Sequence, residues 1–233
     1  MLPELWVCHL GLVEYREALA LQERLRAARQ EDELPDVLLL LEHPPVYTRG
    51  RRSQPGELPM GEAWYAAQGI DVVETDRGGL VTYHGPGQLV GYPIVRVDDV
   101  VGYVRCLENA LVRALVDEGV ASARSRPREG HRYTGVWVEE RKIASVGIHL
   151  SRGVSTHGFA VNVENDLQPF SWIVPCGLDG VRMTSLLRET GRTPSVMKCF
   201  RRRAAFEVAR GLGRRQRLVS LARLETRAGM PVA

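Results

Sequence analysis

Cysteine and lysine, the residue types best suited to nucleophilic and proton-transfer chemistry, are both scarce in this chain. Of the four cysteines, Cys176 stands alone between a proline and a glycine, in the irregular segment IVPCGL at residues 173–178. Loops often carry catalytic groups, and a thiol becomes a nucleophile when its surroundings favour the thiolate. The other three occupy a predicted strand or helical stripes and are interpreted as small core residues: Cys8, Cys106 and Cys199. On this segment alone, Cys176 is either a reactive thiol or an inert loop residue.

Lysine is rarer still relative to arginine. Of 31 basic residues only Lys142 and Lys198 are lysines, so 29 are arginines. Lys142 begins a predicted strand whose next residues are small or apolar, and desolvation of a lysine favours its neutral, basic form. The sequence therefore suggests a proton-transfer role for Lys142. Two alternatives are open. Lys142 could lie at a strand edge with its side chain in water, or the scarcity of lysine could reflect only a drift in the base composition of the gene.

A glycine-rich segment at residues 77–88 is the third chemical feature. Its glycines allow positive φ angles and expose backbone N–H groups, which can hold a carbonyl oxygen or a phosphate. The spacing matches neither a phosphate-binding Walker loop nor a dinucleotide fingerprint, and a plain hairpin is the alternative. His84 and His157 lie in predicted glycine-flanked turns, where we expect hydrogen-bonded structural roles more than acid–base roles.

The elements that must position these residues follow from hydrophobic periodicity. Helical spacing predicts helices over residues 12–25, 100–115 and 194–210, the second ended by Gly119. Strands are predicted at residues 37–41, 71–75, 80–83, 89–97, 134–139, 142–149 and 155–163, with a polar loop at 48–60. The pattern predicts an α/β (α+β) fold, a mixed β-sheet flanked by helices. We expect one catalytic domain over residues 1–233, of which 214–233 form a basic C-terminal extension.

Composition narrows the class of protein. The chain is 44% hydrophobic and 25% charged, and its longest aliphatic run, residues 37–41, is far shorter than the roughly 20 residues of a membrane helix. With no secretory signal, no C-x-x-C pair and no metal-type cluster, we expect a reduced, cytoplasmic protein without membrane contact. A basic cluster lies at residues 198–217; it is either a solvated helix face or a surface that steers an acidic partner. Nucleic acid is disfavoured because the net charge is only +3.

Together the motifs resemble one family. The runs RGGLVTYHGPGQLVGYPI, RKIASVGIHLSRGVSTHGFAVNV and IVPCGL, in order over residues 77–178, resemble the LipB family of lipoyl (octanoyl) transferases, as does LEHPPVYT at residues 41–48. The resemblance implies a fold similar to the catalytic domains of biotin protein ligases and lipoate ligases. It implies octanoyl transfer from acyl carrier protein to a lysine of a lipoyl domain, the first step of endogenous protein lipoylation. The implied acceptors are the lipoyl domains of 2-oxo acid dehydrogenase complexes and the glycine cleavage H protein.

The resemblance also implies the site. Its nucleophile falls on Cys176 and its catalytic lysine on Lys142, and no cofactor is expected beyond the phosphopantetheine of the carrier protein. The implied substrate-binding residues are Arg77, Gly78, Gly79, Leu80, Val81, Thr82, Tyr83, His84, Ser145, Val146, Gly147, Gly158, Phe159 and Ala160. Two other functions stay open from the residues: an ATP-dependent lipoate or biotin ligase on the same fold, and a non-catalytic protein that binds acyl carriers. Whether Lys142 acts as a neutral base or as a cation is also open.

Overall fold

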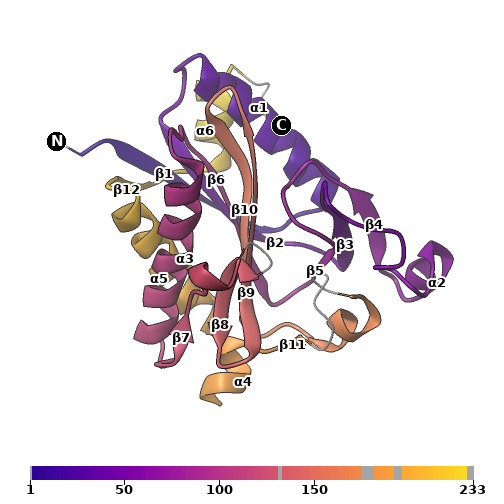
Figure 1. Cartoon of the computed structure of the whole chain (residues 1–233). Helices are drawn as coiled ribbons and strands as arrows, with labels where there is room; N and C mark the ends of the chain where they lie inside the picture. Colours follow the sequence, from indigo (N-terminus) through magenta and orange to yellow (C-terminus); the bar gives the residue numbers. More distant parts are fainter. Residues whose placement is uncertain (1, 131–132, 175–180, 192–195, 230–233) are drawn as a thin grey trace.

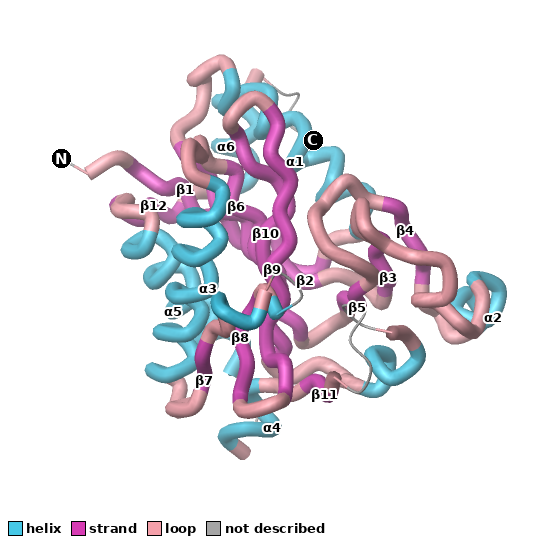
Figure 2. The backbone as a smooth tube through the Cα atoms, viewed as in Figure 1, coloured by secondary structure: helices cyan, strands magenta, loops and turns pink. Residues whose placement is uncertain are grey.

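The computed structural model describes residues 2–130, 133–174, 181–191 and 196–229. Over these residues it contains a mixed nine-stranded sheet and a separate three-stranded sheet, with helices packed on both faces of the larger one (Figure 1, Figure 2). The predicted fold class, a mixed sheet flanked by helices, is confirmed.

The large sheet runs in the order β12-β1-β2-β6-β10-β9-β8-β7, with β11 beside β9. Its strands are β1 (Glu4–Leu12), β2 (Asp36–Glu42), β6 (Gln88–Ile94), β7 (Ala123–Arg124), β8 (Gly135–Val138), β9 (Arg141–Ser151), β10 (Val154–Asn162), β11 (Arg182–Met183) and β12 (Arg215–Leu218). The small sheet has the order β4-β3-β5, with β3 (Val46–Arg49), β4 (Asp71–Glu74) and β5 (Thr82–His84). Pairing in the large sheet is parallel at β12-β1-β2 and at β11-β9 and antiparallel elsewhere.

The aliphatic run of β2 is explained by burial on both faces of the sheet. Successive residues of a strand point to opposite faces. Leu38 and Leu40 accordingly join the core beneath α3 (Val100–Asp117) and α5 (Val196–Gly211), whereas Leu39 and Leu41 join the core beneath α1 (Tyr15–Gln30) and α6 (Leu221–Arg227). Figure 1 shows α3 and α5 side by side on their face. Strands β10 and β9 lie between β6 and β8 in this sheet, with β11 beside β9.

The small sheet has a core of its own, built from tyrosines. The rings of Tyr47 and Tyr65 lie 4.9 Å apart, and that of Tyr83 lies 5.5 Å from Tyr47. Next to them are the short helix α2 (Glu62–Ala67) and the 3-10 helix η3 (Gln168–Trp172), which brings Phe170 into the same core. Two other short helices lie in the described part of the chain, η1 (Pro127–Glu129) and α4 (Leu186–Thr190).

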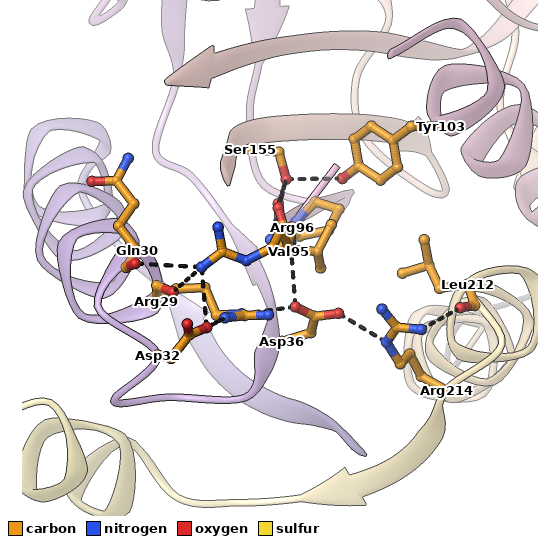
Figure 3. A network of polar contacts seen from close by, with 11 residues as sticks. Arg29, Gln30, Asp32, Asp36, Val95, Arg96, Tyr103, Ser155, Leu212 and Arg214 are labelled. Atoms are coloured by element: carbon orange, nitrogen blue, oxygen red, sulfur yellow. Dashed lines mark hydrogen bonds and ion pairs between the residues drawn. The ribbon is translucent and has the colours of Figure 1, made fainter. Parts of the chain in front are cut away.

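The C-terminal segment is part of the fold. Within residues 214–233, expected as a basic C-terminal extension, residues 215–218 form the edge strand β12 and residues 221–227 the helix α6, whose Leu224 is fully buried. Arg214, at the start of this segment, donates from Nε to the buried Asp36 at 2.9 Å, and Arg29 of α1 donates to the other carboxylate oxygen at 2.9 Å. Figure 3 shows this contact, in which one buried carboxylate joins β2, α1 and the start of β12.

Several elements differ from the prediction. The strand β12 and the helices α2, α4 and α6 were not expected, whereas β1 is the strand expected around Cys8. Residues 48 and 49 belong to β3 and not to the polar loop. His157 lies inside β10 and not in a turn. Cys199, expected in the core, is exposed on α5, whereas Cys8 is buried and Cys106 half-buried. No helix in the described ranges is both long enough and apolar enough to cross a membrane.

Candidate active site

Lys142 is a buried amine near the start of β9. Its side chain is 2% exposed, and its Nζ lies 5.4 Å from the centre of the Trp137 ring. The Trp137 indole is fixed in turn, because its Nε1 donates to the carbonyl of Tyr133 at 2.8 Å. The prediction that Lys142 is desolvated is thus met, and the strand-edge alternative is wrong.

Gly135 of β8 lies against the Lys142 side chain, and its lack of a side chain leaves room for the lysine. A Cβ at this position would overlap the carbonyl oxygen of Ala144 and lie 2.8 Å from Cε of Lys142, and φ is +132°. The Gly135 amide is held by the fully buried carboxylate of Glu108 on α3, which accepts its N–H at 2.7 Å. Because the lysine stem crosses a position where only glycine fits, α3 and β8 together fix the place of the amine.

The glycine-rich segment is attached directly to β9. Gly78 donates from its N–H to the carbonyl of Ile148 at 2.8 Å, and its own carbonyl lies 2.7 Å from where a Cβ of Gly147 would stand. Arg77 is buried and reaches back to the small sheet, donating from Nη2 to the hydroxyl of Thr48 at 2.8 Å. The segment therefore bridges the two sheets, and Gly147 is required for its close approach.

The remaining predicted site residues lie on the paired strands β9 and β10, and the register of this pair sets which of them face each other. In the antiparallel pair β9-β10, Ser145 stands opposite Ala160, Val146 opposite Phe159, and Gly147 opposite Gly158. The Phe159 ring lies over Gly91 of β6, where any Cβ would overlap it. The resemblance implied two separate groups of binding residues here, and pairing of the two strands makes them one surface.

A small pocket of about 70 Å³ lies where these segments converge. Its lining includes Lys142 and every predicted substrate-binding residue except Tyr83, which packs against Tyr47 in the core of the small sheet. Four further lining residues were missed by the sequence analysis: Tyr15, Val90, Tyr92 and His157. Lys142, Gly78, Gly79, Leu80, Val146 and Gly147 also line a larger cleft of about 880 Å³. One arrangement thus links a buried amine, an apolar recess and an open cleft.

Buried histidines surround the pocket. His43 donates from Nδ1 to the carbonyl of Val13 at 2.7 Å and accepts the Tyr92 hydroxyl at Nε2 at 2.7 Å, and burial lowers its pKa to about 4. Burial also lowers the pKa of His84 well below its ordinary value, and its Nδ1 donates to Gln88 at 2.7 Å. These histidines are neutral, hydrogen-bonded groups at neutral pH, as expected for His84.

His157 links the pocket to the residue that precedes the glycine-rich segment. Its Nε2 donates to Asp76 at 2.6 Å, and this hydrogen bond lowers the pKa of the Asp76 carboxyl. Burial lowers the pKa of His157 itself. His157 has a φ of +56°, a conformation that is costly for a residue with a side chain. The hydrogen-bonded role expected for His157 is confirmed, although its place in the fold was wrong.

Cys176, with its neighbour Gly177, lies outside the described residues, but both flanks of its segment are described. On one side, Val174 lines the large cleft together with Lys142, and its N–H donates to the carbonyl of Glu57 at 3.1 Å. On the other side, Met183 is the register partner of Lys142 in the β11-β9 pair. One flank of the segment therefore lines the cleft that contains Lys142, and the other flank pairs with Lys142.

The basic cluster at residues 198–217 is largely neutralised within the fold. Five of its arginines contact carboxylates: Arg203 with Asp117, Arg210 with Glu207, Arg214 with Asp36, and Arg215 and Arg217 with Glu4. Lys198 and Arg202 remain exposed without an ion pair to any described residue. The cluster is therefore mainly a structural feature of the C-terminal segment.

Solved structures with low sequence identity place this fold in a class. A putative lipoate protein ligase from T. acidophilum, Ta0514, solved with bound lipoic acid, aligns over 98% of this chain and 94% of its own with a TM-score of 0.75 at 18% identity. A biotin protein ligase from Aquifex aeolicus aligns over 90% of this chain and 69% of its own, with a TM-score of 0.51 at 13% identity. The catalytic-domain fold shared by lipoate and biotin ligases, implied by the motifs, is confirmed.

Sequence comparison identifies the family. The model of the lipoyl protein ligase A/B catalytic domain matches residues 14–205. Proteins named octanoyltransferase are similar over most of the chain: that of Caldicellulosiruptor bescii is 48% identical over 80% of this chain and 82% of its own, and that of Dictyoglomus thermophilum 41% identical over 86% and 84%. The chain belongs to the lipoyl protein ligase A/B catalytic domain family, on its LipB octanoyltransferase branch. It is an acyltransferase.

Proposed function

We propose that the protein moves an octanoyl group from octanoyl-acyl carrier protein to one lysine of a lipoyl domain, in the cytoplasm, through a thioester on Cys176. The acceptors are the lipoyl domains of 2-oxo acid dehydrogenase complexes and the glycine cleavage H protein. The observation that carries the proposal is the burial of the Lys142 amine in a pocket where the glycine-rich segment meets β9 and β10. The octanoyltransferase relatives supply the identity of the acyl group.

The connectivity of the chain supports a short distance between the side chains of Cys176 and Lys142. Cys176 lies two positions after Val174, with Pro175 between them, which bounds the distance between their Cα atoms to roughly 7 Å. Val174 lines the cleft that contains Lys142, and Thr184 donates from its N–H to the Lys142 carbonyl at 3.0 Å. A thiol attached at these two points is well placed to exchange a proton with the amine.

The chemistry requires an activated thiol. A free thiol has a pKa of about 8.5, so only a few per cent is thiolate at neutral pH. A nearby lysine increases reactivity either by removing the proton or by stabilising the thiolate as a cation. Both roles need the amine close to the thiol and screened from bulk water, which the burial of Lys142 supplies.

The reaction then has two balanced steps. The Cys176 thiolate forms a bond to the thioester carbonyl, the bond to the pantetheine sulfur breaks, and Lys142 gives that sulfur its proton. The neutral acceptor amine next attacks the octanoyl-enzyme, the bond to Cys176 breaks, and Lys142 takes the excess proton from the new amide nitrogen. No ATP is needed, because the amide is more stable than the thioester.

Backbone N–H groups are the natural donors to the oxyanion of each tetrahedral intermediate. Three glycines of the motif segments are candidates: Gly78, Gly79 and Gly177. Gly78 already donates its N–H to Ile148 and is therefore excluded. Gly79, with a φ of +97°, lines both the pocket and the cleft and remains the described candidate. Gly177 is the third.

The acyl chain needs an apolar wall beside the amine. Leu80, Val146 and Phe159, three apolar members of the implied substrate-binding set, all line the small pocket, as do Val90 and Ala160. We assign the octanoyl chain to this recess and the pantetheine arm to the larger cleft.

A direct assay separates transfer from ligation. Purified protein is incubated with a lipoyl domain and either octanoyl-acyl carrier protein alone or free octanoate with ATP and magnesium, and octanoylation of the lipoyl domain is followed by mass spectrometry. The proposal predicts modification with the carrier-bound donor only. Modification with octanoate and ATP alone would show a ligase, and binding of the carrier without any transfer would show a non-catalytic protein.

A further inference from the structure

A cleft connects the buried lysine to two exposed arginines. Its inner part includes Lys142, which is 2% exposed, and its outer part includes Arg51 and Arg52, which are both exposed. Val104 of α3 contributes to its lining. A substrate in this cleft would have its reacting end at the amine and its outer end at the guanidinium groups.

The two arginines are held by the same segment that forms the inner pocket. Arg51 donates its backbone N–H to the carbonyl of Arg77 at 3.0 Å, and Arg52 donates its N–H to the carbonyl of Gly79 at 3.1 Å. Gly50 permits this contact, because a Cβ there would lie 2.5 Å from the Gly79 oxygen. The arginine pair and the glycine-rich segment are therefore one hydrogen-bonded unit, with a fixed relation between cleft mouth and site.

The charge of this pair is not neutralised within the described part of the chain. Neither guanidinium lies within ion-pair distance of a described carboxylate, whereas Arg49, two residues earlier, contacts both Glu62 and Glu74. Glu57 also lines the cleft but is buried, and its carboxylate accepts the N–H of Val81 at 3.0 Å. The mouth of the cleft thus presents two cations to an incoming substrate.

A phosphodiester fits such a pair. Guanidinium groups bind phosphate oxygens through charge-assisted, often bidentate hydrogen bonds. In an acyl carrier the thioester lies at one end of the pantetheine arm and the phosphodiester at the other, where the arm joins an acidic protein. Resting on the proposed function, we propose that Arg51 and Arg52 are the docking site for the phosphodiester of the acyl-phosphopantetheine donor.

The acceptor is a poorer match for this surface. Its target side chain is a lysine, which is cationic in solution at neutral pH, and two guanidinium groups at the entrance disfavour the approach of a cation. The arginine pair therefore acts on the donor step and not on the acceptor step.

Three donors test the assignment in the full-length protein: octanoyl-acyl carrier protein, octanoyl-phosphopantetheine and octanoyl-pantetheine, the last without phosphate. The variant is R51E/R52E, and the matched control is K198E/R202E, which makes the same change of charge on exposed α5 positions. We expect the KM for both phosphate-bearing donors to rise about tenfold or more in R51E/R52E. Loss of a hydrogen bond to a charged group weakens binding by about this factor. The KM for octanoyl-pantetheine, the KM for the lipoyl domain and the kcat should stay within about twofold, and the control should behave as the wild type.

Four results would overturn the assignment: an equal rise with octanoyl-pantetheine, a rise confined to the lipoyl domain, an equal rise in the control, or no rise at all. The first would mean that the arginines shape the pocket, and the second that they bind the acceptor. If the wild type accepts none of the three donors, the proposed function itself fails, which is a distinct outcome.

Discussion

At the scale of single residues, the position of the Lys142 side chain depends on the absence of a side chain at Gly135. Lys142 is the residue to which we assign proton transfer, and the Gly135 position beneath its stem and the Glu108 carboxylate that holds the Gly135 amide decide where its amine lies. Neither residue has a motif-like signal in the sequence. Glu108 lies on the apolar stripe of α3, where a fully buried acid is unusual and would have been the only available clue.

Gly135→Ala tests this dependence. The added methyl group would overlap the Ala144 carbonyl and press on Cε of Lys142. We expect kcat to fall about 100-fold, since a displacement near 1 Å in a catalytic group has that effect. The measurement is single-turnover octanoyl transfer, together with the thermal midpoint to establish that the variant is folded.

Gly153→Ala is the control for backbone strain. Gly153, in the turn between β9 and β10, has a φ of +74° but no atom within 4 Å of its absent Cβ. It should lose stability, by about 1 kcal/mol, and keep the wild-type kcat. A folded Gly135→Ala protein that turned over as fast as Gly153→Ala would contradict the role assigned to Gly135.

At the scale of elements, the sequence predicted what local periodicity encodes. The helix α3 and the strand β2 were found because an apolar stripe or an aliphatic run reveals them without reference to the rest of the chain. The edge strand β12 was missed, although its partner β1 was expected as the strand that carries Cys8. Glu4 pairs with Arg215 across most of the chain length, and no local pattern records such a pairing.

The same distinction applies to the site. The residues of the three motifs were predicted from the family resemblance, which carries non-local information. Tyr15, Tyr92 and His157 were missed as pocket residues because their exposure to the site depends on how α1, β6 and β10 pack together. The misplacement of His157 has a local cause: the flanking Gly158 resembles a turn signal, but that glycine instead lies opposite Gly147 in the strand pair.

At the scale of the whole molecule, the buried histidines couple stability to pH. Burial lowers the pKa of His9, His43, His84 and His157, so the folded chain binds fewer protons than the unfolded chain, whose histidines have a pKa near 6.5. Stability must therefore fall as the pH drops below about 6.5. The pKa of the Asp76 carboxyl is lowered in the folded protein, so this group stays ionised and keeps its stabilising effect in this pH range.

His43→Gln measures one part of this effect. With a folded pKa of about 4, His43 should account for about 2 kcal/mol of the stability lost between pH 7.5 and pH 5. Urea unfolding at the two pH values should show a loss smaller by that amount in the variant. Equal losses in the variant and the wild type would mean that His43 is already protonated, or solvated, in the folded protein.

The central claim is that one thiol, Cys176, carries the acyl group between donor and acceptor. Its most direct test is the intact mass of the protein after incubation with octanoyl-acyl carrier protein and no acceptor. We predict a gain of one octanoyl group that disappears on addition of a lipoyl domain, persists in Cys199→Ser, which removes an exposed thiol, and is absent in Cys176→Ser. Octanoyl transfer to the lipoyl domain by a protein that never gains this mass, or labelling that survives in Cys176→Ser, would contradict the claim.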